Sequence, residues 1–343
     1  MKLPDQGVTE MARASHNATK LFAGLLASWL LLPMFMAHAD EAAPTAALPR
    51  VELLRPQQLI SGGRLAARTD ANGFPLPGAL QGYVNFVFPS AVAVRGQDVY
   101  VADSGKRKLY RIDTALQVVS EVQGVDVVTW TRLRVAPDHS LFVLDASQTK
   151  ILRYTRGGRL LQTFRDPLTT ARMVDFSVSP SMDRVVVLDA LNQQLVALHP
   201  SGKAGQPLDV QGVGALAAQS GVAASGRQLY VIDSGCNCVA VLDEQGRARA
   251  QIGKGVLTLP RALAVDSAGR VFVVDAADRT LKIFQGGALV ASYQARALRL
   301  TEFSDLAIDD NWLYVADGPG ARIAVFRIAP TVSPAAAPAM EPH

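Results

Sequence analysis

The chain has 343 residues, of which 49% are hydrophobic and 19% charged, so its composition is that of a folded globular protein. Its formal net charge of +4 is only mildly basic and falls far short of the dense positive charge of a nucleic-acid-binding protein. Two cysteines exclude a disulfide scaffold and a cysteine-rich zinc module, and the absence of a run of about eighteen apolar residues after position 40 excludes a multi-pass membrane protein.

The first 39 residues have the pattern of a secretory signal peptide. Lys20 precedes an apolar run at 21–37, and the small residues of the Ala-His-Ala triplet at 37–39 suit the cleavage site. The alternative is an uncleaved membrane anchor, which the good cleavage triplet disfavours. We expect cleavage before Asp40 and a periplasmic or secreted protein without a transmembrane span in its mature chain.

Segments rich in Pro and Ala flank the part of the chain that we expect to fold. Residues 40–49 are typical of a disordered linker, and residues 329–343 are typical of a disordered tail. The folded domain is therefore expected over residues 50–328, which is ample length for a hydrophobic core.

A repeat occupies most of this domain. Six times a short apolar run ends in an aspartate, and successive aspartates are 42, 44, 44, 42 and 42 positions apart. These residues are Asp103, Asp145, Asp189, Asp233, Asp275 and Asp317. Another short strand-like segment precedes each run, a third follows it after a turn, and in five repeats a weaker fourth comes next. Four strands in about 42–44 residues are typical of the blade of a β-propeller.

The sequence therefore predicts an all-β fold, a six-bladed β-propeller with four-stranded antiparallel blades. The run before each aspartate is apolar almost throughout, as expected for a strand that neighbouring blades cover on both faces. The sixth repeat ends at Ile328 without a fourth strand, and the segment 51–60 (VELLRPQQLI) has no other partner. We expect this N-terminal strand to pair with 322–328 and close the last blade, which removes exposed sheet edges.

Three stretches carry a resemblance to a known family: VYVADSGKRKLYRI at 99–112, LPRALAVDSAGRVFVVDAADRTLKIF at 259–284 and LAIDDNWLYVADGPGARIAVF at 306–326. They resemble the NHL repeat, which reads as an inner strand, a V-Y-V-A-D-S-G-like strand and turn, and an R-I-x-V-F-like strand. The resemblance spans roughly residues 90–328 and implies a six-bladed propeller of the exported bacterial NHL-repeat type. It is unspecific for function, because such propellers serve as binding platforms, sensor domains and, less often, enzymes.

The six aspartates suggest calcium ligands, but a structural role is favoured. Each one ends a strand, where its carboxylate can accept hydrogen bonds from N–H groups of the following turn, and the six fall in separate blades. Amidating-lyase propellers, which the chain distantly resembles, use a set of histidines at the metal. Residues 40–343 hold only His139 and His199 in turns and His343 at the end of the tail. We therefore expect no metal and no other cofactor.

Cys236 and Cys238 follow Asp233 and are separated by a single residue. In an oxidising compartment two lone thiols usually pair, although a bridge across one residue closes a very small ring. A structural disulfide, two unreacted thiols and a redox site are all open, and the redox site is the least favoured because no other cysteine is present to resolve it.

Basic residues gather on one predicted face of the ring. In a propeller this face is formed by the turns after the second strands and by the segments that lead into the first strands. Arg132, Arg172 and Arg261 lie near the starts of three first strands, with Trp130 beside them, and predict an anion-preferring pocket at the channel mouth. The turns supply a second basic set: Lys106, Arg107, Lys108, Lys150, Arg279 and Arg322.

Nearer the axis, four charged residues stand where other repeats have small residues: Arg132, Arg134, Asp175 and Asp305. We count them as candidate binding residues as well. The alternative for Arg134 and Asp175, which belong to adjacent blades, is a structural ion pair.

Three functions are compatible with these patterns. The favoured one is an exported, noncatalytic scaffold that binds a protein, peptide or glycan, anionic in character, through the basic rim. The first alternative is a propeller enzyme of the lactonase or lyase type, and the second is a redox-linked protein that uses Cys236 and Cys238. Nucleic acid is not an expected partner.

Overall fold

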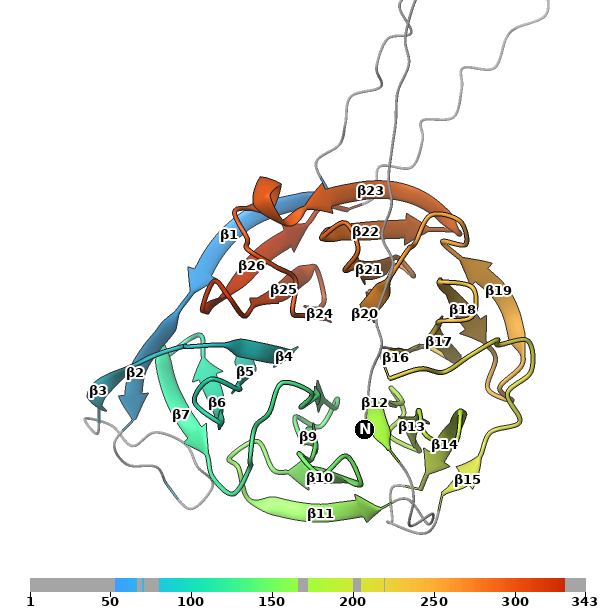
Figure 1. The fold of residues 1–343 in the computed structure, drawn as a ribbon. Coiled ribbons are helices and arrows are strands. Elements are labelled where there is room, and N and C mark those ends of the chain that lie inside the picture. Colours follow the sequence, from blue (N-terminus) through green and yellow to red (C-terminus); the bar gives the residue numbers. More distant parts are fainter. Residues whose placement is uncertain are drawn as a thin grey trace, which may run out of the picture. The chain divides into compact units, whose positions relative to one another are not determined.

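Six β-sheets form blades around a central axis (Figure 1). The computed structural model describes residues 53–66, 70, 80–165, 172–199, 205–218 and 220–330. The predicted six-bladed, all-β propeller is confirmed within them. The predicted signal peptide (1–39), the linker (40–49) and the tail beyond Pro330 lie outside the described residues.

Each blade is antiparallel, and its innermost strand lines the axis. From the axis outward, the first three blades are β4 (Pro89–Arg95), β5 (Asp98–Asp103), β6 (Lys108–Asp113) and β7 (Val118–Val122); β8 (Leu133–Val135), β9 (Leu141–Leu144), β10 (Lys150–Tyr154) and β11 (Leu160–Arg165); and β12 (Met173–Val178), β13 (Val185–Asp189), β14 (Gln194–Leu198) and β15 (Gln206–Pro207). The last three are β16 (Val222–Ser225), β17 (Gln228–Asp233), β18 (Cys238–Leu242) and β19 (Ala248–Ile252); β20 (Pro260–Val265), β21 (Val271–Asp275), β22 (Thr280–Gln285) and β23 (Ala288–Gln294); and β24 (Asp305–Asp309), β25 (Trp312–Asp317), β26 (Arg322–Ile328) and β1 (Leu54–Ile60).

The last blade is closed by the N-terminal strand, as predicted. β1 runs antiparallel to β26, with Leu54 opposite Ile328 and Ile60 opposite Ile323. The pairing continues one residue beyond the strands, because the N–H of Ala329 donates to the carbonyl of Leu53 at 2.8 Å. The two ends of the propeller are thus held together by one antiparallel strand pair.

The first blade carries an addition that the repeat pattern did not predict. A hairpin of β2 (Gly62–Ala66) and β3 (Leu80–Asn85) extends it to six strands, and β2 lies parallel to the outer strand β7. The contact needs glycine, because a Cβ atom on Gly63 would lie 2.6 Å from Cγ2 of Val119. The hairpin therefore covers the edge of the first blade that would otherwise be exposed.

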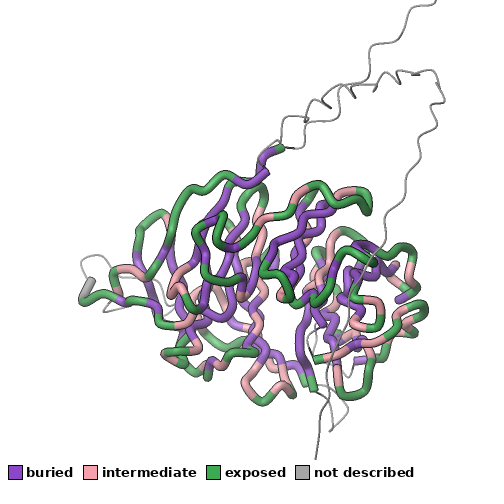
Figure 2. The backbone as a smooth tube through the Cα atoms, turned by 45° about the horizontal axis from the view of Figure 1, so that its top comes forward, coloured by how far each residue is buried: buried purple, intermediate pink, exposed green. Residues whose placement is uncertain are grey.

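The second strand of each blade is buried on both faces, which explains why these strands are apolar without alternation (Figure 2). In β5, Val99 and Val101 pack into the cluster shared with the sixth blade. Tyr100 and Ala102, which point the other way, pack into the cluster shared with the second blade. The core of the protein is thus a series of clusters between adjacent blades.

Helix is almost absent from the described part of the chain. The 3₁₀ helix η1 (Ala295–Leu298) has four residues and connects β23 to the sixth blade. Among these residues no helix is long and apolar enough to cross a membrane.

The closure of the ring predicts unequal effects of two leucines in β1. Leu54 is fully buried in the cluster between the last two blades, whereas Leu59 is half exposed. We expect Leu54→Ala to lower the free energy of unfolding by about 2–5 kcal/mol through lost burial and a residual cavity, and Leu59→Ala to change it by about 0.5 kcal/mol or less. Urea unfolding of both variants checks this, and equal effects would contradict the role assigned to β1.

Candidate ligand-binding mouth of the central channel

The aspartates that end the second strands organise one face of the ring. Asp103 accepts the N–H groups of Val87 and Phe88, which precede the first strand, each at 2.9 Å. It also accepts those of Gly105 and Lys106 in the following turn, at 3.1 and 3.2 Å. The bonds from the turn were predicted, and those from the preceding loop were not. Each such carboxylate joins two loops of its blade.

The same arrangement recurs in four other blades. The partners in the preceding loop are Arg172 for Asp189, Gly214 and Ala215 for Asp233, Thr258 and Leu259 for Asp275, and Thr301 and Glu302 for Asp317. In the second blade Asp145 bonds to Ser147 of its own turn, and the hydroxyl of Thr131 instead accepts the N–H of Val128 at 3.0 Å. The predicted structural role of these aspartates is supported by this bonding.

Two of these carboxylates have lowered pKa values. Burial, the strongest single influence, acts against ionisation of Asp189 and Asp275. Hydrogen bonds from Asn192 and backbone N–H groups outweigh it at Asp189, and bonds from Lys282 and backbone N–H groups outweigh it at Asp275. Both are therefore ionised acceptors near neutral pH.

A pocket of about 440 Å³, called here the mouth pocket, lies on this face. Arg132 reaches it from the second blade, and Arg261 and Arg279 reach it from the fifth blade, on the opposite side of the axis. Among the described residues no carboxylate forms an ion pair with any of the three arginines. Glu302 is the one acidic residue in the lining, so the mouth pocket has an excess of positive charge.

Apolar side chains form part of the same pocket. Phe88, Leu259 and Phe303 line it beside the arginines. The approach of Arg132 and Arg261 across the mouth was predicted from their positions before two first strands, whereas no sequence pattern indicated these three residues or Glu302. The pocket can therefore contact both charged and apolar groups of a ligand.

Two further candidates, Arg172 and Trp130, lie on the same face outside the pocket lining. Arg172 is exposed, and its backbone N–H donates to the carboxylate of Asp189 at 3.0 Å. Trp130 is 45% exposed, and its indole Nε1 donates to the carbonyl of Ala146 at 3.0 Å. The ring of Trp130 is thus presented to solvent in a fixed orientation.

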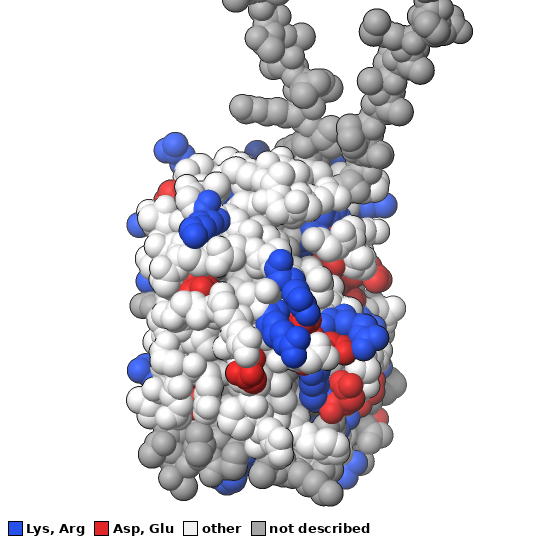
Figure 3. All heavy atoms as spheres, turned by 90° about the vertical axis from the view of Figure 1, so that its right-hand side faces the viewer, with Lys and Arg blue, Asp and Glu red and all other residues white. Residues whose placement is uncertain are grey.

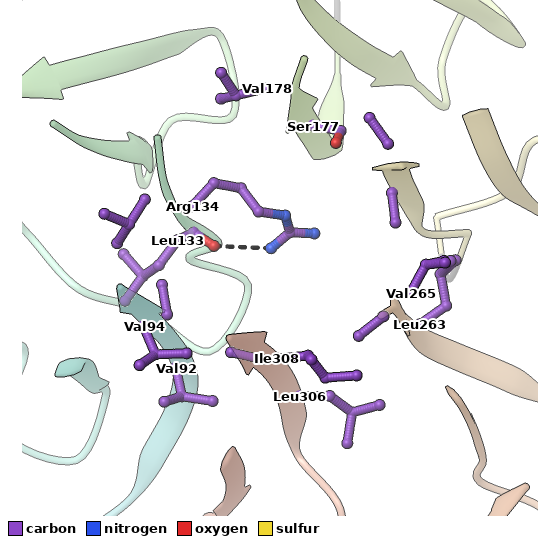
Figure 4. Close-up of a pocket in the computed structure, with 16 residues that line it drawn as sticks. Val92, Val94, Leu133, Arg134, Ser177, Val178, Leu263, Val265, Leu306 and Ile308 are labelled. Atoms are coloured by element: carbon purple, nitrogen blue, oxygen red, sulfur yellow. Dashed lines mark hydrogen bonds between the residues drawn. The ribbon is translucent and has the colours of Figure 1, made fainter. Parts of the chain in front are cut away.

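Arg134 occupies the channel itself (Figure 4). Its Nη2 donates to both carboxylate oxygens of Asp175 at 2.8 and 3.1 Å, and its Nη1 donates to the carbonyl of Leu133 at 2.8 Å. Asp175 also accepts the N–H of Val222 at 2.9 Å, and the guanidinium lies 5.6 Å from the centre of the Phe176 ring. This is the structural ion pair considered from the sequence, and it leaves a channel cavity of about 190 Å³.

Asp305 holds the corresponding position on the opposite side of the axis. It accepts the N–H of Val92 in the next blade at 3.1 Å, just as Asp175 bonds to the blade that follows it. Burial raises the pKa of Asp305, and the negative charge of Asp175 acts in the same direction. The charges of Arg132 and Arg134 oppose this without cancelling it. Asp305 is a component of the axis rather than of the mouth pocket.

Most of the second basic set proposed from the turns is neutralised. The ion pairs are Arg107 with Asp126 at 2.6 Å, Lys108 with Glu121 at 2.7 Å, Lys150 with Asp145 at 3.6 Å and Arg322 with Asp317 at 3.0 Å. Within the described ranges, Lys106 and Arg279 form no such pair. The basic character of this face therefore comes mainly from the mouth pocket and not from a complete outer ring.

The perimeter of the ring shows the same mixing of charge. On the side that carries β19, Lys and Arg lie beside Asp and Glu (Figure 3). Arg227 pairs with Glu244 and Arg249 pairs with Asp243, each at 2.6 Å. Exposed pairs of this kind contribute little to stability and leave no net field for an anion.

Cys236 and Cys238 are joined in a disulfide, with 5.2 Å between their Cα atoms. They flank Asn237, whose φ of 48° is left-handed. The matching turn of the second blade also has a left-handed residue, and the flanking side chains of Ser147 and Thr149 lie 2.8 Å apart across it. In the fourth blade the disulfide closes the turn covalently across Asn237.

Asp233 lies beside this disulfide, and the three residues have potential ligand atoms within 4.8 Å of one another. Both sulfurs are, however, used by the disulfide. The carboxylate of Asp233 is already bonded to the N–H groups of Gly214 and Ala215 at 2.7 and 2.9 Å. With the disulfide formed, Asp233, Cys236 and Cys238 stabilise the turn of the fourth blade and do not fit a metal ion.

No protein-family model matches the sequence, and no curated protein matches it either. Solved structures share its fold. Virginiamycin B lyase from Staphylococcus aureus has 10% identity and a TM-score of 0.52, over 71% of this chain and 96% of the lyase. A protein of unknown function from Bacteroides thetaiotaomicron has 14% identity and a TM-score of 0.59, over 80% of this chain and 77% of that one.

A further similar structure is a histidine-to-alanine variant of the S. aureus lyase, catalytically inactive and crystallised with quinupristin. It has 10% identity and a TM-score of 0.51, over 80% of this chain and 98% of the lyase. At such low identity these similarities support the six-bladed propeller fold alone. The NHL-repeat resemblance continues to rest on the sequence motifs.

Loss of the axial ion pair should weaken the fold. Arg134→Ala removes two charge-assisted hydrogen bonds from the buried Asp175, so we expect a loss of about 1.5–3 kcal/mol in the free energy of unfolding. Arg261→Ala removes an exposed side chain without an ion pair and should change it by about 0.5 kcal/mol or less. Urea unfolding measures both, and an equally stable Arg134→Ala variant would show that the pair is not structural.

Asp305 should make stability depend on pH in a defined direction. Because its pKa is raised in the folded protein, its favourable contribution is complete below the unfolded value of about 4 and is lost as pH rises through the folded value. Asp305→Asn keeps an acceptor for Val92 but cannot ionise. Between about pH 4 and pH 8, the melting temperature of the variant should increase relative to that of the wild type as pH rises. A constant difference across this range would contradict the assignment.

Proposed function

We propose that this chain is an exported, noncatalytic propeller of the NHL-repeat type that binds an anionic protein, peptide or glycan at the mouth of its central channel. The observation that carries the proposal is the mouth pocket, where Arg132 faces Arg261 and Arg279 across the axis with one carboxylate in the lining. Positive charges that converge on a concave, low-dielectric site attract anions more strongly than the net charge of +4 suggests.

Export is the second part of the proposal. The predicted signal peptide over residues 1–39 supports a periplasmic or secreted location, with Asp40 as the first residue of the mature chain. The disulfide between Cys236 and Cys238 is consistent with an oxidising compartment. Its role as a staple of the turn favours a structural function over the redox alternative.

The lactonase or lyase alternative draws support from fold alone. Two structural neighbours are a virginiamycin B lyase and a streptogramin B lyase, and a histidine-to-alanine variant of the former is catalytically inactive. In the described residues of this chain, His139 lies in the β8–β9 turn and His199 follows β14, both on the face opposite the mouth. We favour binding without a metal or other cofactor.

Binding of a defined polyanion tests the proposal. Fluorescein-labelled poly-L-glutamate should bind the purified chain in a fluorescence anisotropy assay. The affinity should fall when sodium chloride is raised from about 20 to about 300 mM, because exposed charges are screened over about 8 Å at physiological ionic strength. The double variant Arg132→Ala/Arg261→Ala should bind about tenfold more weakly or worse, since it loses two charges of the pocket.

The control is Arg159→Ala. Arg159 is an exposed residue of the β10–β11 turn on the opposite face, so its loss should leave the affinity unchanged. The proposal fails if the double variant binds as tightly as the wild type at low salt. It also fails if the same preparation consumes virginiamycin B.

A further inference from the structure

Exposed apolar side chains lie on the same face of the ring as the mouth pocket. Those on its face are Val87 (53% exposed), Trp130 (45%), Leu191 (59%), Val256 (41%) and Leu259 (37%), here called the apolar collar. They come from loops and turns of four blades, all on the side where the second strands end. Single exposed apolar residues are ordinary, but a set that shares one face with a concave charged site is typical of an interaction surface.

The collar is held rigidly. The N–H groups of Val87, Leu191 and Leu259 donate to the strand-end aspartates of their blades at 2.9, 3.0 and 2.9 Å. The indole of Trp130 is fixed by its bond to the carbonyl of Ala146. Because these hydrogen bonds already order the loops, the protein would lose little conformational freedom when a ligand binds.

At two places on the mouth face an exposed apolar residue stands close to an arginine in the sequence. Trp130 is two residues from Arg132, and Leu259 is two residues from Arg261. Leu259, Arg132 and Arg261 all line the mouth pocket itself. A ligand bound across the mouth can therefore contact an apolar side chain and a guanidinium in both the second and the fifth blade.

We propose that the mouth face binds an extended peptide segment, or an exposed loop of a partner protein, in which carboxylate and bulky apolar side chains alternate along the side that faces the mouth. The inference rests on the proposed function and names the class of ligand within it. Carboxylates satisfy the arginines of the mouth pocket, and the apolar side chains cover the collar. In an extended peptide side chains two positions apart point to the same side, so a repeat of two acidic and two apolar residues presents both kinds of group on the side that faces the mouth.

An acidic glycan matches the surface less well. Its carboxylates suit the arginines, but sugars pack mainly on aromatic rings, and Trp130 is the one aromatic member of the collar. The aliphatic members Val87, Leu191, Val256 and Leu259 would remain in contact with water. An acidic and apolar peptide uses the whole surface.

The test compares three labelled probes in fluorescence anisotropy at low salt. The first is an octapeptide with the repeat Glu-Glu-Leu-Leu, called the alternating peptide because Glu and Leu alternate along each of its sides, the second is an octapeptide of Glu alone, and the third is an alginate oligomer. We expect the alternating peptide to bind about tenfold more tightly than the Glu octapeptide, with alginate weakest. Arg261→Ala should weaken binding of both peptides. Trp130→Ala and Leu259→Ser should each weaken the alternating peptide severalfold and leave the Glu octapeptide unchanged.

Leu116→Ser is the matched control. Leu116 is 62% exposed in the β6–β7 turn, on the opposite face of the ring, so its replacement should alter neither affinity. Melting temperatures of all variants establish that each one is folded. Two substitutions in the collar, one aromatic and one aliphatic, keep the test decisive if either destabilises the protein.

The outcomes separate this inference from the proposed function. If both peptides bind equally and Trp130→Ala changes neither affinity, the collar is not used and the inference is wrong, whereas a loss with Arg261→Ala still supports an anion site. If alginate binds more tightly than either peptide, the ligand is a glycan and the inference is overturned. If no probe depends on Arg261, the proposed function itself fails.

Discussion

Hydrogen bonds to a buried carboxylate at the end of the second strand are the interaction on which the mouth of this propeller depends. In most blades that carboxylate accepts backbone N–H groups from both the following turn and the loop that precedes the first strand. Buried N–H groups are costly when unpaired, so the aspartate determines where both segments lie. Arg261 follows a segment anchored in this way at Leu259, whereas the hydroxyl of Thr131 orders the loop that leads to Arg132. The geometry of the site is therefore a consequence of the fold.

Much of the fold could be predicted because the repeat expresses a physical requirement. A strand packed between two blades must be apolar on both faces, and a carboxylate must end it, so the period of the aspartates gave the number of blades. Counting strands gave the closure by β1. The β2–β3 hairpin had no such signal, because it belongs to no repeat and its docking on β7 depends on the small size of Gly63.

The site was less predictable, because it depends on contacts between distant segments. The start of a first strand always faces the mouth, so the approach of Arg132 and Arg261 followed from topology. A basic side chain in a turn is available to a ligand only when no carboxylate of the protein pairs with it. The carboxylates of Asp126 and Glu121 lie thirteen or more positions along the chain from Arg107 and Lys108, which they neutralise. Sequence spacing does not reveal such pairs. It also gave no sign that Leu259 would line the pocket.

The closure of the ring by β1 has a consequence for how the protein acquires its structure. Leu54 and Ile328 pair although they are 274 positions apart, so one of the first strands in the chain needs one of the last. During synthesis from the N-terminus, β1 emerges without its partner and stays unpaired until β26 has been made. Long-range pairing of this kind is slow, and the open edge is prone to aggregation meanwhile. We therefore expect that β1 has to be protected from aggregation until the rest of the propeller has been made.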